Sequence, residues 1–222
     1  MSSIQAQLQL IKDSLPASVT LVAVSKTKPA SAIEEAYAAG QRIFGENRVQ
    51  EVEEKFALLP KDIQWHLIGH LQSNKVKYIA PFIAMIHAVD DEELLAVIDK
   101  EAKKNNRTID CLIQIHIAQE ESKFGMSEAE ARHFFESGNW KHYSNVNIRG
   151  LMGMATFTEN EQQIREEFNG LSSLFKQLRG GVMANQPTFD QLSIGMSGDY
   201  RIAIEAGSTL VRVGSAIFGD RH

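Results

Sequence analysis

The chain of 222 residues lacks the features that mark secreted, membrane-spanning and nucleic-acid-binding proteins. Its single cysteine, Cys111, excludes an internal disulfide bond and lies in an apolar run typical of a buried core thiol. No apolar run approaches the ~20 residues of a membrane-spanning helix, and the first residues lack the basic and then apolar pattern of a signal peptide. The formal net charge of −5 gives no reason to expect nucleic acid or an anionic membrane as partner. We therefore expect a cytoplasmic protein.

Common catalytic motifs are missing as well. The sequence contains neither the Gly-x-Ser-x-Gly turn of hydrolases nor the Gly-x-x-x-x-Gly-Lys-[Ser/Thr] loop of nucleotide-binding enzymes. His66 and His70 have the i, i+4 spacing of paired metal ligands, but they straddle a predicted strand-to-helix junction. No set of carboxylates or cysteines accompanies them, so we expect no metal site.

What the sequence does contain is a regular alternation of short apolar strands and amphipathic helices over almost its whole length. Such alternation requires a parallel sheet with helical crossovers, and eight repeats favour a single closed (β/α)8 barrel covering residues 1–222. The rival is an open doubly wound sheet, but the turn after the first strand lacks a dinucleotide-binding fingerprint. The predicted strands are 20–26, 42–44, 64–68, 84–89, 109–117, 148–152, 189–194 and 209–213.

Lys26 closes the first predicted strand. By the two-residue period of a strand it shares a face with Val24 and Val22, so its side chain is expected on the side of core residues. Burial lowers the pKa of a lysine and yields the neutral amine that Schiff-base formation needs. The alternative is that Lys26 has already left the strand and lies in solvent.

The last two strands carry a second group of candidates. Arg212 lies within a buried strand, where its planar fork needs a carboxylate, a phosphate or a ring nitrogen as partner. Gly214 permits close approach of the backbone to a ligand, and the turn at Ser197 opens a predicted helix. A structural carboxylate partner for Arg212 and simple helix capping by Ser197 are the alternatives.

Six segments, in order along the chain, resemble the pyridoxal phosphate homeostasis protein family. They are Ala23-Val-Ser-Lys-Thr-Lys-Pro, Phe44-Gly-Glu-Asn-Arg-Val-Gln-Glu, Trp65-His-Leu-Ile-Gly-His-Leu-Gln-Ser-Asn-Lys, Gly150-Leu-Met-Gly-Met-Ala, Leu192-Ser-Ile-Gly-Met-Ser-Gly-Asp and Val211-Arg-Val-Gly-Ser-Ala-Ile-Phe-Gly. The resemblance implies a barrel like the amino-terminal domain of bacterial alanine racemase, a fold-type-III arrangement. It also implies that pyridoxal 5′-phosphate (PLP) is held as a Schiff base on Lys26.

The resemblance also implies roles for the other candidates. Arg212 is expected to face the pyridine nitrogen of PLP, and Asn47 to lie beside the ring. The phosphate is expected on Ser193, Ser197, Gly214 and Ser215. Lys123 matches a family lysine thought to contact or transfer the cofactor, and Ile194 departs from the methionine that is usual in the family.

Two functions remain open from the sequence. A carrier or buffer of PLP is favoured because Arg212 cannot accept a proton from the ring nitrogen, so this nitrogen stays neutral. The neutral pyridine ring is a weak electron sink for catalysis on amino acids. We also expect the carboxyl-terminal β domain, which supplies the second base of racemases, to be absent, since the chain stops at His222. The alternative is a racemase or lyase with an unrecognised second acid or base. For the carrier we expect a monomer without catalytic residues that contacts PLP-dependent apoenzymes transiently.

Overall fold

The computed structural model describes residues 3–120 and 124–219, and within these residues eight parallel strands close into a barrel. The strands follow the order of the chain, and β1 pairs with β8 to complete the ring. Their bounds are β1 Thr20–Val24, β2 Ile43–Glu46, β3 Gln64–Leu67, β4 Met85–Val89, β5 Ile109–Ile115, β6 Val146–Gly153, β7 Gln191–Met196 and β8 Leu210–Val213. The predicted (β/α)8 barrel is confirmed.

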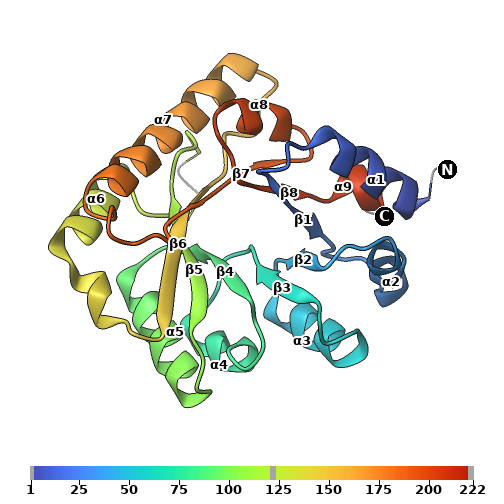
Figure 1. Cartoon of the computed structure of the whole chain (residues 1–222), viewed down its shortest axis with the longest axis horizontal. Helices are drawn as coiled ribbons and strands as arrows, with labels where there is room; N and C mark the ends of the chain where they lie inside the picture. The colour runs from blue at the N-terminus through green and yellow to red at the C-terminus, as the bar shows by residue number, and fades with distance from the viewer. Residues whose placement is uncertain (1–2, 121–123, 220–222) are drawn as a thin grey trace.

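Helices surround the barrel, and Figure 1 shows them outside the ring of strands in the order of the chain. Helices α1 and α9 pack together where the two ends of the barrel sequence meet. The helical segments are α1 Ile4–Ser14, α2 Ala30–Ala38, α3 Val49–Leu58, α4 Val76–Ile79, α5 Glu92–Lys104, α6 Glu128–Ser137, α7 Glu161–Gly180, α8 Tyr200–Glu205 and α9 Ser215–Phe218, with 3-10 turns η1 Ser73–Lys75 and η2 Asn139–His142.

Alternation along the strands separates two apolar layers. Residues that point outward, such as Leu21 and Val211, join one large core between the strands and the helices. Residues that point inward form a smaller cluster within the barrel, with Val22, Leu112 and Leu210 among its members. Both faces of each strand are therefore buried, which explains why the strands read as continuous apolar runs. Cys111 belongs to the outer core, as predicted.

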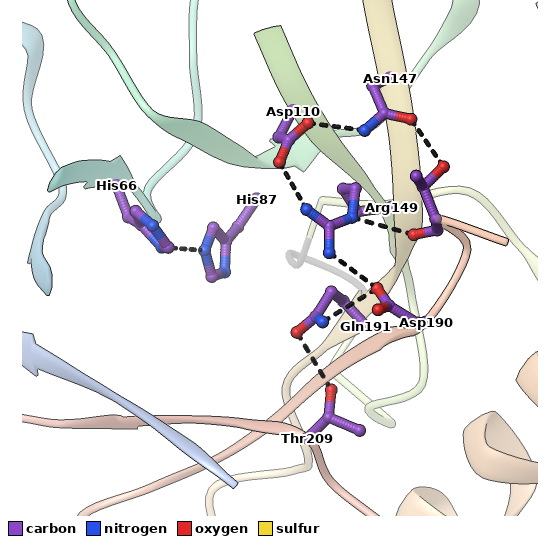
Figure 2. A network of polar contacts seen from close by, with 9 residues as sticks. His66, His87, Asp110, Asn147, Arg149, Asp190, Gln191 and Thr209 are labelled. Carbon is purple, nitrogen blue, oxygen red and sulfur yellow. Dashed lines mark hydrogen bonds and ion pairs between the residues drawn. The ribbon is translucent and has the colours of Figure 1, made fainter. Parts of the chain in front are cut away.

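A polar network closes the barrel at the amino ends of β5 to β8 (Figure 2). Arg149 donates to Asp110 at 2.7 Å and to Asp190 at 2.9 Å, so one guanidinium bridges two carboxylates from different strands. Asn147 adds a bond to Asp110, and Gln191 links Asp190 with Thr209. Because this network joins protein groups to one another at the end opposite the carboxyl ends of the strands, we assign it a structural role.

Candidate functional site

A cavity of about 520 Å³ opens at the carboxyl ends of the strands, where barrels of this type carry their functional sites. Its lining comes from the ends of nearly all the strands and from the loops that follow them. Of the seven predicted site residues, six line this cavity: Lys26, Asn47, Ser197, Arg212, Gly214 and Ser215. The fold therefore places around one cavity residues that are up to 189 positions apart in the sequence, from Lys26 to Ser215.

Lys26 reaches the cavity from a turn and not from a strand. Strand β1 ends at Val24, so the predicted strand 20–26 was two residues too long. Thr27 has φ 65°, a left-handed conformation that a β-branched residue rarely adopts, and this reverses the chain immediately after Lys26. The lysine is half-buried, which lies between the two predicted environments, and its side chain lines the cavity.

A buried ion pair between Lys55 and Glu46 holds the backbone of this turn in place. The Lys55 ammonium lies 2.7 Å from Glu46 Oε1 and donates to the carbonyl oxygen of Ser25 at 2.9 Å. The Ser25 hydroxyl donates to the same Glu46 oxygen at 2.6 Å, and Glu51 accepts from the backbone N–H of Thr27 at 2.8 Å. We call Ser25, Glu46, Glu51 and Lys55 the Lys55 cluster. It fixes the residues on both sides of Lys26.

Burial dominates the electrostatics of this cluster. It raises the pKa of Glu46 to about 7, although the Lys55 ammonium and the Ser25 hydroxyl act in the opposite direction. Glu46 Oε2 is buried without a hydrogen-bond partner among the described residues. The carboxylate of Glu46 therefore depends on Lys55 for compensation of its charge.

Arg212 is almost fully buried, with 3% of its surface exposed, at the inner end of the cavity. Its guanidinium donates to the carbonyl oxygens of Ser193 at 2.8 Å and Gly153 at 2.9 Å, and also to the Ser193 hydroxyl. These hydrogen-bond acceptors are neutral, whereas the alternative of a structural carboxylate finds a candidate in Asp199, whose charge acts on Arg212. Burial lowers the pKa of Arg212 to about 10, which leaves the group positively charged at neutral pH.

Ser193 lies beneath Arg212 and does not line the cavity. Its side chain is fully buried, and besides Arg212 it contacts His87 Nδ1 at 3.0 Å. The role of Ser193 as a phosphate contact remains a prediction from the resemblance, and its position in the structure favours a supporting role behind Arg212.

Behind Ser193, two histidines extend the chain of hydrogen bonds into the barrel. His87 Nε2 lies 2.9 Å from His66 Nδ1, and Figure 2 shows the two rings side by side. Both side chains are buried, and burial lowers the pKa of His66 to about 3 and that of His87 well below its ordinary value. In the sequence, the i, i+4 spacing of His66 and His70 indicated only a possible metal ligand. The contact with His87 was not predicted because it joins residues 21 positions apart.

The turns after β7 and β8 form one wall of the cavity. Ser197 Oγ accepts from the backbone N–H of Gly214 at 3.0 Å, so the two turns are tied together. A Cβ at Gly214 would lie 3.1 Å from the carbonyl oxygen of Val24, which leaves little room for a side chain. Gly198 and Ser215 complete the wall, which we call the phosphate wall after the ligand that the sequence resemblance predicts for it.

The opposite side of the cavity contains a histidine that the sequence analysis did not assign to the site. His70 lines the cavity, its Nδ1 lies 3.1 Å from Asp90 Oδ2, and its ring stacks on Phe124 with centroids 3.9 Å apart. Asn47 lies close by, because a Cβ on Gly69 would lie 2.5 Å from the Asn47 carbonyl oxygen. Lys123, the remaining candidate, lies outside the described residues.

The histidine pair predicts a specific dependence of stability on pH. Unfolded His66 binds a proton below its ordinary pKa of 6.5, whereas folded His66 resists protonation until about pH 3. The stability that His66 contributes above pH 6.5 is therefore lost progressively as the pH falls below 6.5. We expect His66→Gln to reduce the slope of unfolding free energy against pH between pH 6 and 5, by an amount that approaches about 1.4 kcal/mol per pH unit as unfolded His66 becomes fully protonated.

Urea unfolding of the two proteins at several pH values measures this slope, with His133→Gln on the exposed face of α6 as the control for loss of a histidine. Parallel curves for the parent protein and His66→Gln would show that His66 is protonated equally in the folded and unfolded states.

Two classes of site find no support in the described parts of the chain. Residues 3–120 and 124–219 contain no group of three or more histidine, cysteine, aspartate or glutamate side chains able to hold a metal ion. No helix within these residues is long and apolar enough to cross a membrane.

Solved structures with this fold include close relatives. PipY of Synechococcus elongatus is 38% identical, and the match covers 97% of this chain and 100% of PipY, with a TM-score of 0.91 for the structure without PLP. The structure of PipY with PLP bound gives a TM-score of 0.87. The alanine racemase of Bartonella henselae, at 19% identity and a TM-score of 0.73, shares the fold over 98% of this chain and 58% of its own.

Sequence comparison agrees with the structural matches. The pyridoxal phosphate homeostasis protein of Aquifex aeolicus is 40% identical over 202 residues, covering 90% of this chain and 86% of the relative. The protein of the same name from Escherichia coli is 38% identical, covering 93% of this chain and 87% of the relative. The family model described as the N-terminal domain of alanine racemase matches residues 1–222. The chain therefore belongs to the alanine racemase N-terminal domain family and, within it, to the pyridoxal phosphate homeostasis proteins.

Proposed function

We propose that the chain binds PLP, holds it through Lys26 and acts as a carrier or buffer that regulates PLP supply without catalysing a reaction. The observation that carries the proposal is the convergence of Lys26, Arg212 and the phosphate wall on one cavity. The amine of Lys26 suits the aldehyde of PLP, and the buried guanidinium of Arg212 suits its ring nitrogen. The hydroxyl and backbone groups of the phosphate wall suit its phosphate. The PLP-bound structure of PipY, a relative at 38% identity, supports the same choice of cofactor.

The residues of the cavity fit the cofactor. A Cβ at Gly214 would lie 3.1 Å from the carbonyl oxygen of Val24, so a glycine here lets the turn after β8 lie close to the end of β1 at the cavity. The hydroxyls of Ser197 and Ser215 lie on the same wall. Arg212 uses its hydrogen bonds to Ser193 and Gly153 to hold its fork in place, which leaves its other N–H groups for a ligand.

Arg212 also argues against catalysis on amino acids. PLP supplies a strong electron sink when its ring nitrogen is protonated, which an acidic partner favours. The guanidinium of Arg212 donates a hydrogen bond and disfavours a second positive charge beside it. A site built in this way retains the cofactor but stabilises negative charge at Cα of an amino acid poorly.

A carrier needs reversible retention rather than turnover. Lys26 lies in a half-buried turn at the cavity wall, so amines that enter the cavity can compete for the aldehyde. The partners we propose are PLP and, transiently, PLP-dependent apoenzymes, with the protein acting in the cytoplasm as a monomer.

One observation favours the second candidate, a racemase or lyase. His70 lines the same cavity with Asp90 at Nδ1, and a carboxylate–imidazole pair is a common general acid or base. Such a pair could supply the second proton-transfer group that the sequence analysis did not find.

Isotope exchange separates the two functions. We expect α-deuterium on L-alanine to be retained over hours with a stoichiometric amount of PLP-loaded protein, because Arg212 leaves the sink weak. NMR or mass spectrometry of the alanine measures the loss. Washout approaching the ~10 per second typical of enzymes, lost in both Lys26→Ala and His70→Gln, would replace the carrier by the racemase.

A further inference from the structure

Two buried histidines lie beneath the cavity and have no part in the carrier function proposed above. His66 and His87 come from the neighbouring strands β3 and β4, are 4% and 0% exposed, and do not line the cavity. Their hydrogen bonds nevertheless lead through Ser193 to Arg212. We propose that His66 and His87 are positioning residues that hold the Arg212 fork toward the ring nitrogen of the cofactor through Ser193. This inference rests on the proposed function.

The direction of the hydrogen bonds follows from Arg212. A guanidinium has donors only, so Ser193 Oγ accepts from Arg212 Nη1. The single hydroxyl hydrogen of Ser193 is then available for His87 Nδ1, 3.0 Å away, which acts as an acceptor. His87 consequently carries its proton on Nε2 and donates to His66 Nδ1 at 2.9 Å. Every bond in the chain thus points away from Arg212.

This chain replaces the carboxylate that usually orients a buried arginine. The acceptors that hold Arg212 are the Ser193 hydroxyl and the carbonyl oxygens of Ser193 and Gly153, none of which bears a charge. The hydrogen bonds that fix the fork therefore use neutral acceptors, while the charge of Asp199 acts on Arg212 and raises its pKa against the effect of burial. Without His87 as acceptor, the Ser193 hydroxyl hydrogen would lose this buried partner, and the rotamer that presents the Ser193 oxygen to the guanidinium would no longer be fixed.

The arrangement requires both histidines to be neutral. A protonated His87 would donate through Nδ1 toward Ser193 and would place a second positive charge next to Arg212. Complete burial opposes protonation of both rings, and the proximity of Arg212 adds to this effect at His87. The pair is therefore neutral at pH 7, where His87 accepts from Ser193.

The test compares two cofactors that differ only at the ring nitrogen. The first is PLP, and the second is 1-deaza-PLP, in which C–H replaces this nitrogen. Dissociation constants for both are measured by absorbance with the full chain and its variants. The parent protein should prefer PLP, and His87→Leu should reduce this preference about tenfold, because a hydrogen bond to a charged donor contributes on that scale. Binding of 1-deaza-PLP should change less than twofold.

His87→Asn is the matched variant, since asparagine has nearly the size of leucine but places an acceptor where His87 has Nδ1. It should restore most of the preference for PLP. Ser193→Ala interrupts the same chain at another point and should reproduce the selective loss, which gives an independent result if His87→Leu does not fold.

The outcomes distinguish this inference from the carrier proposal. Equal weakening of PLP and 1-deaza-PLP, or an asparagine variant no better than leucine, would reduce the histidines to general packing and overturn the inference. A parent protein that binds neither cofactor would instead overturn the proposed function.

Discussion

Gly214→Asp is expected to weaken PLP binding at least about a hundredfold. The new carboxylate would project at the phosphate wall, next to the backbone N–H that now bonds to Ser197. Juxtaposing like charges in a confined site costs several kcal/mol, and about 2.7 kcal/mol already corresponds to a hundredfold in Kd. The close approach to Val24 gives the side chain little room to turn away. Absorbance titration with PLP measures the effect.

The control adds the same charge where the structure has open space. A Cβ on Gly170, in helix α7, would have no heavy atom within 4 Å apart from the backbone of its own helix turn and its chain neighbours, so Gly170→Asp should leave PLP affinity unchanged. Titration with pyridoxal, which lacks the phosphate, isolates the contribution of the wall. Similar affinities of the parent protein for PLP and pyridoxal would contradict a phosphate site at Gly214.

Lys55→Met is expected to produce the largest loss of stability. It leaves the buried carboxylate of Glu46 without its ammonium partner, and breaking a buried pair in this way costs about 3–5 kcal/mol. The loss should be greater at pH 8 than at pH 6, because burial raises the pKa of Glu46 to about 7 and protonation relieves the uncompensated charge. Urea unfolding at the two pH values measures both effects.

Lys104→Met provides the comparison, since Lys104 pairs with Glu101 at 2.6 Å while 57% of its side chain is exposed. An exposed pair contributes little, so this variant should lose less than about 1 kcal/mol. Equal losses for Lys55→Met and Lys104→Met would show that the Lys55 cluster is not a buried, charge-dependent support. Because Lys55 also holds the carbonyl of Ser25, we expect Lys55→Met to retain less PLP on Lys26.

The barrel could be predicted because each strand is buried on both faces and therefore apolar throughout. Leu21 and Val22, adjacent in β1, belong to the outer and inner layers, and the sequence reflects both. Arg212 could be found for the opposite reason, since a charged residue within such a run must have a partner. Gly214 could be found with it, because it directly follows the strand that contains Arg212.

Features that depend on distant contacts could not be predicted. The strand β1 stops before Lys26 because Lys55 and Glu51, on helix α3, bind the backbone of the turn. Ser193 and Ser197 were assigned together to the phosphate, yet a bulge in β7, with Gly195 at φ 95°, separates their environments. Simple alternation along a strand does not report such a shift in register.

The side of the cavity opposite the phosphate wall shows the same limitation. His70 and Asp90 follow different strands, and their contact depends on how the two loops pack at the end of the barrel. In the sequence, His70 had no feature beyond its spacing from His66. The spacing of His66 and His70 is typical of paired metal ligands, but each histidine instead has a partner on strand β4 or directly after it, His87 and Asp90.

The most direct test of the account is to locate the covalent link between PLP and the protein. Protein saturated with PLP should be yellow, and after reduction with borohydride, peptide mapping by mass spectrometry should place the cofactor on Lys26. The adduct should disappear in Lys26→Ala and persist in Lys28→Ala, whose lysine lines the same cavity. A reduced adduct on Lys28, Lys75 or Lys123 of the parent protein, with Lys26 unmodified, would contradict the central claim.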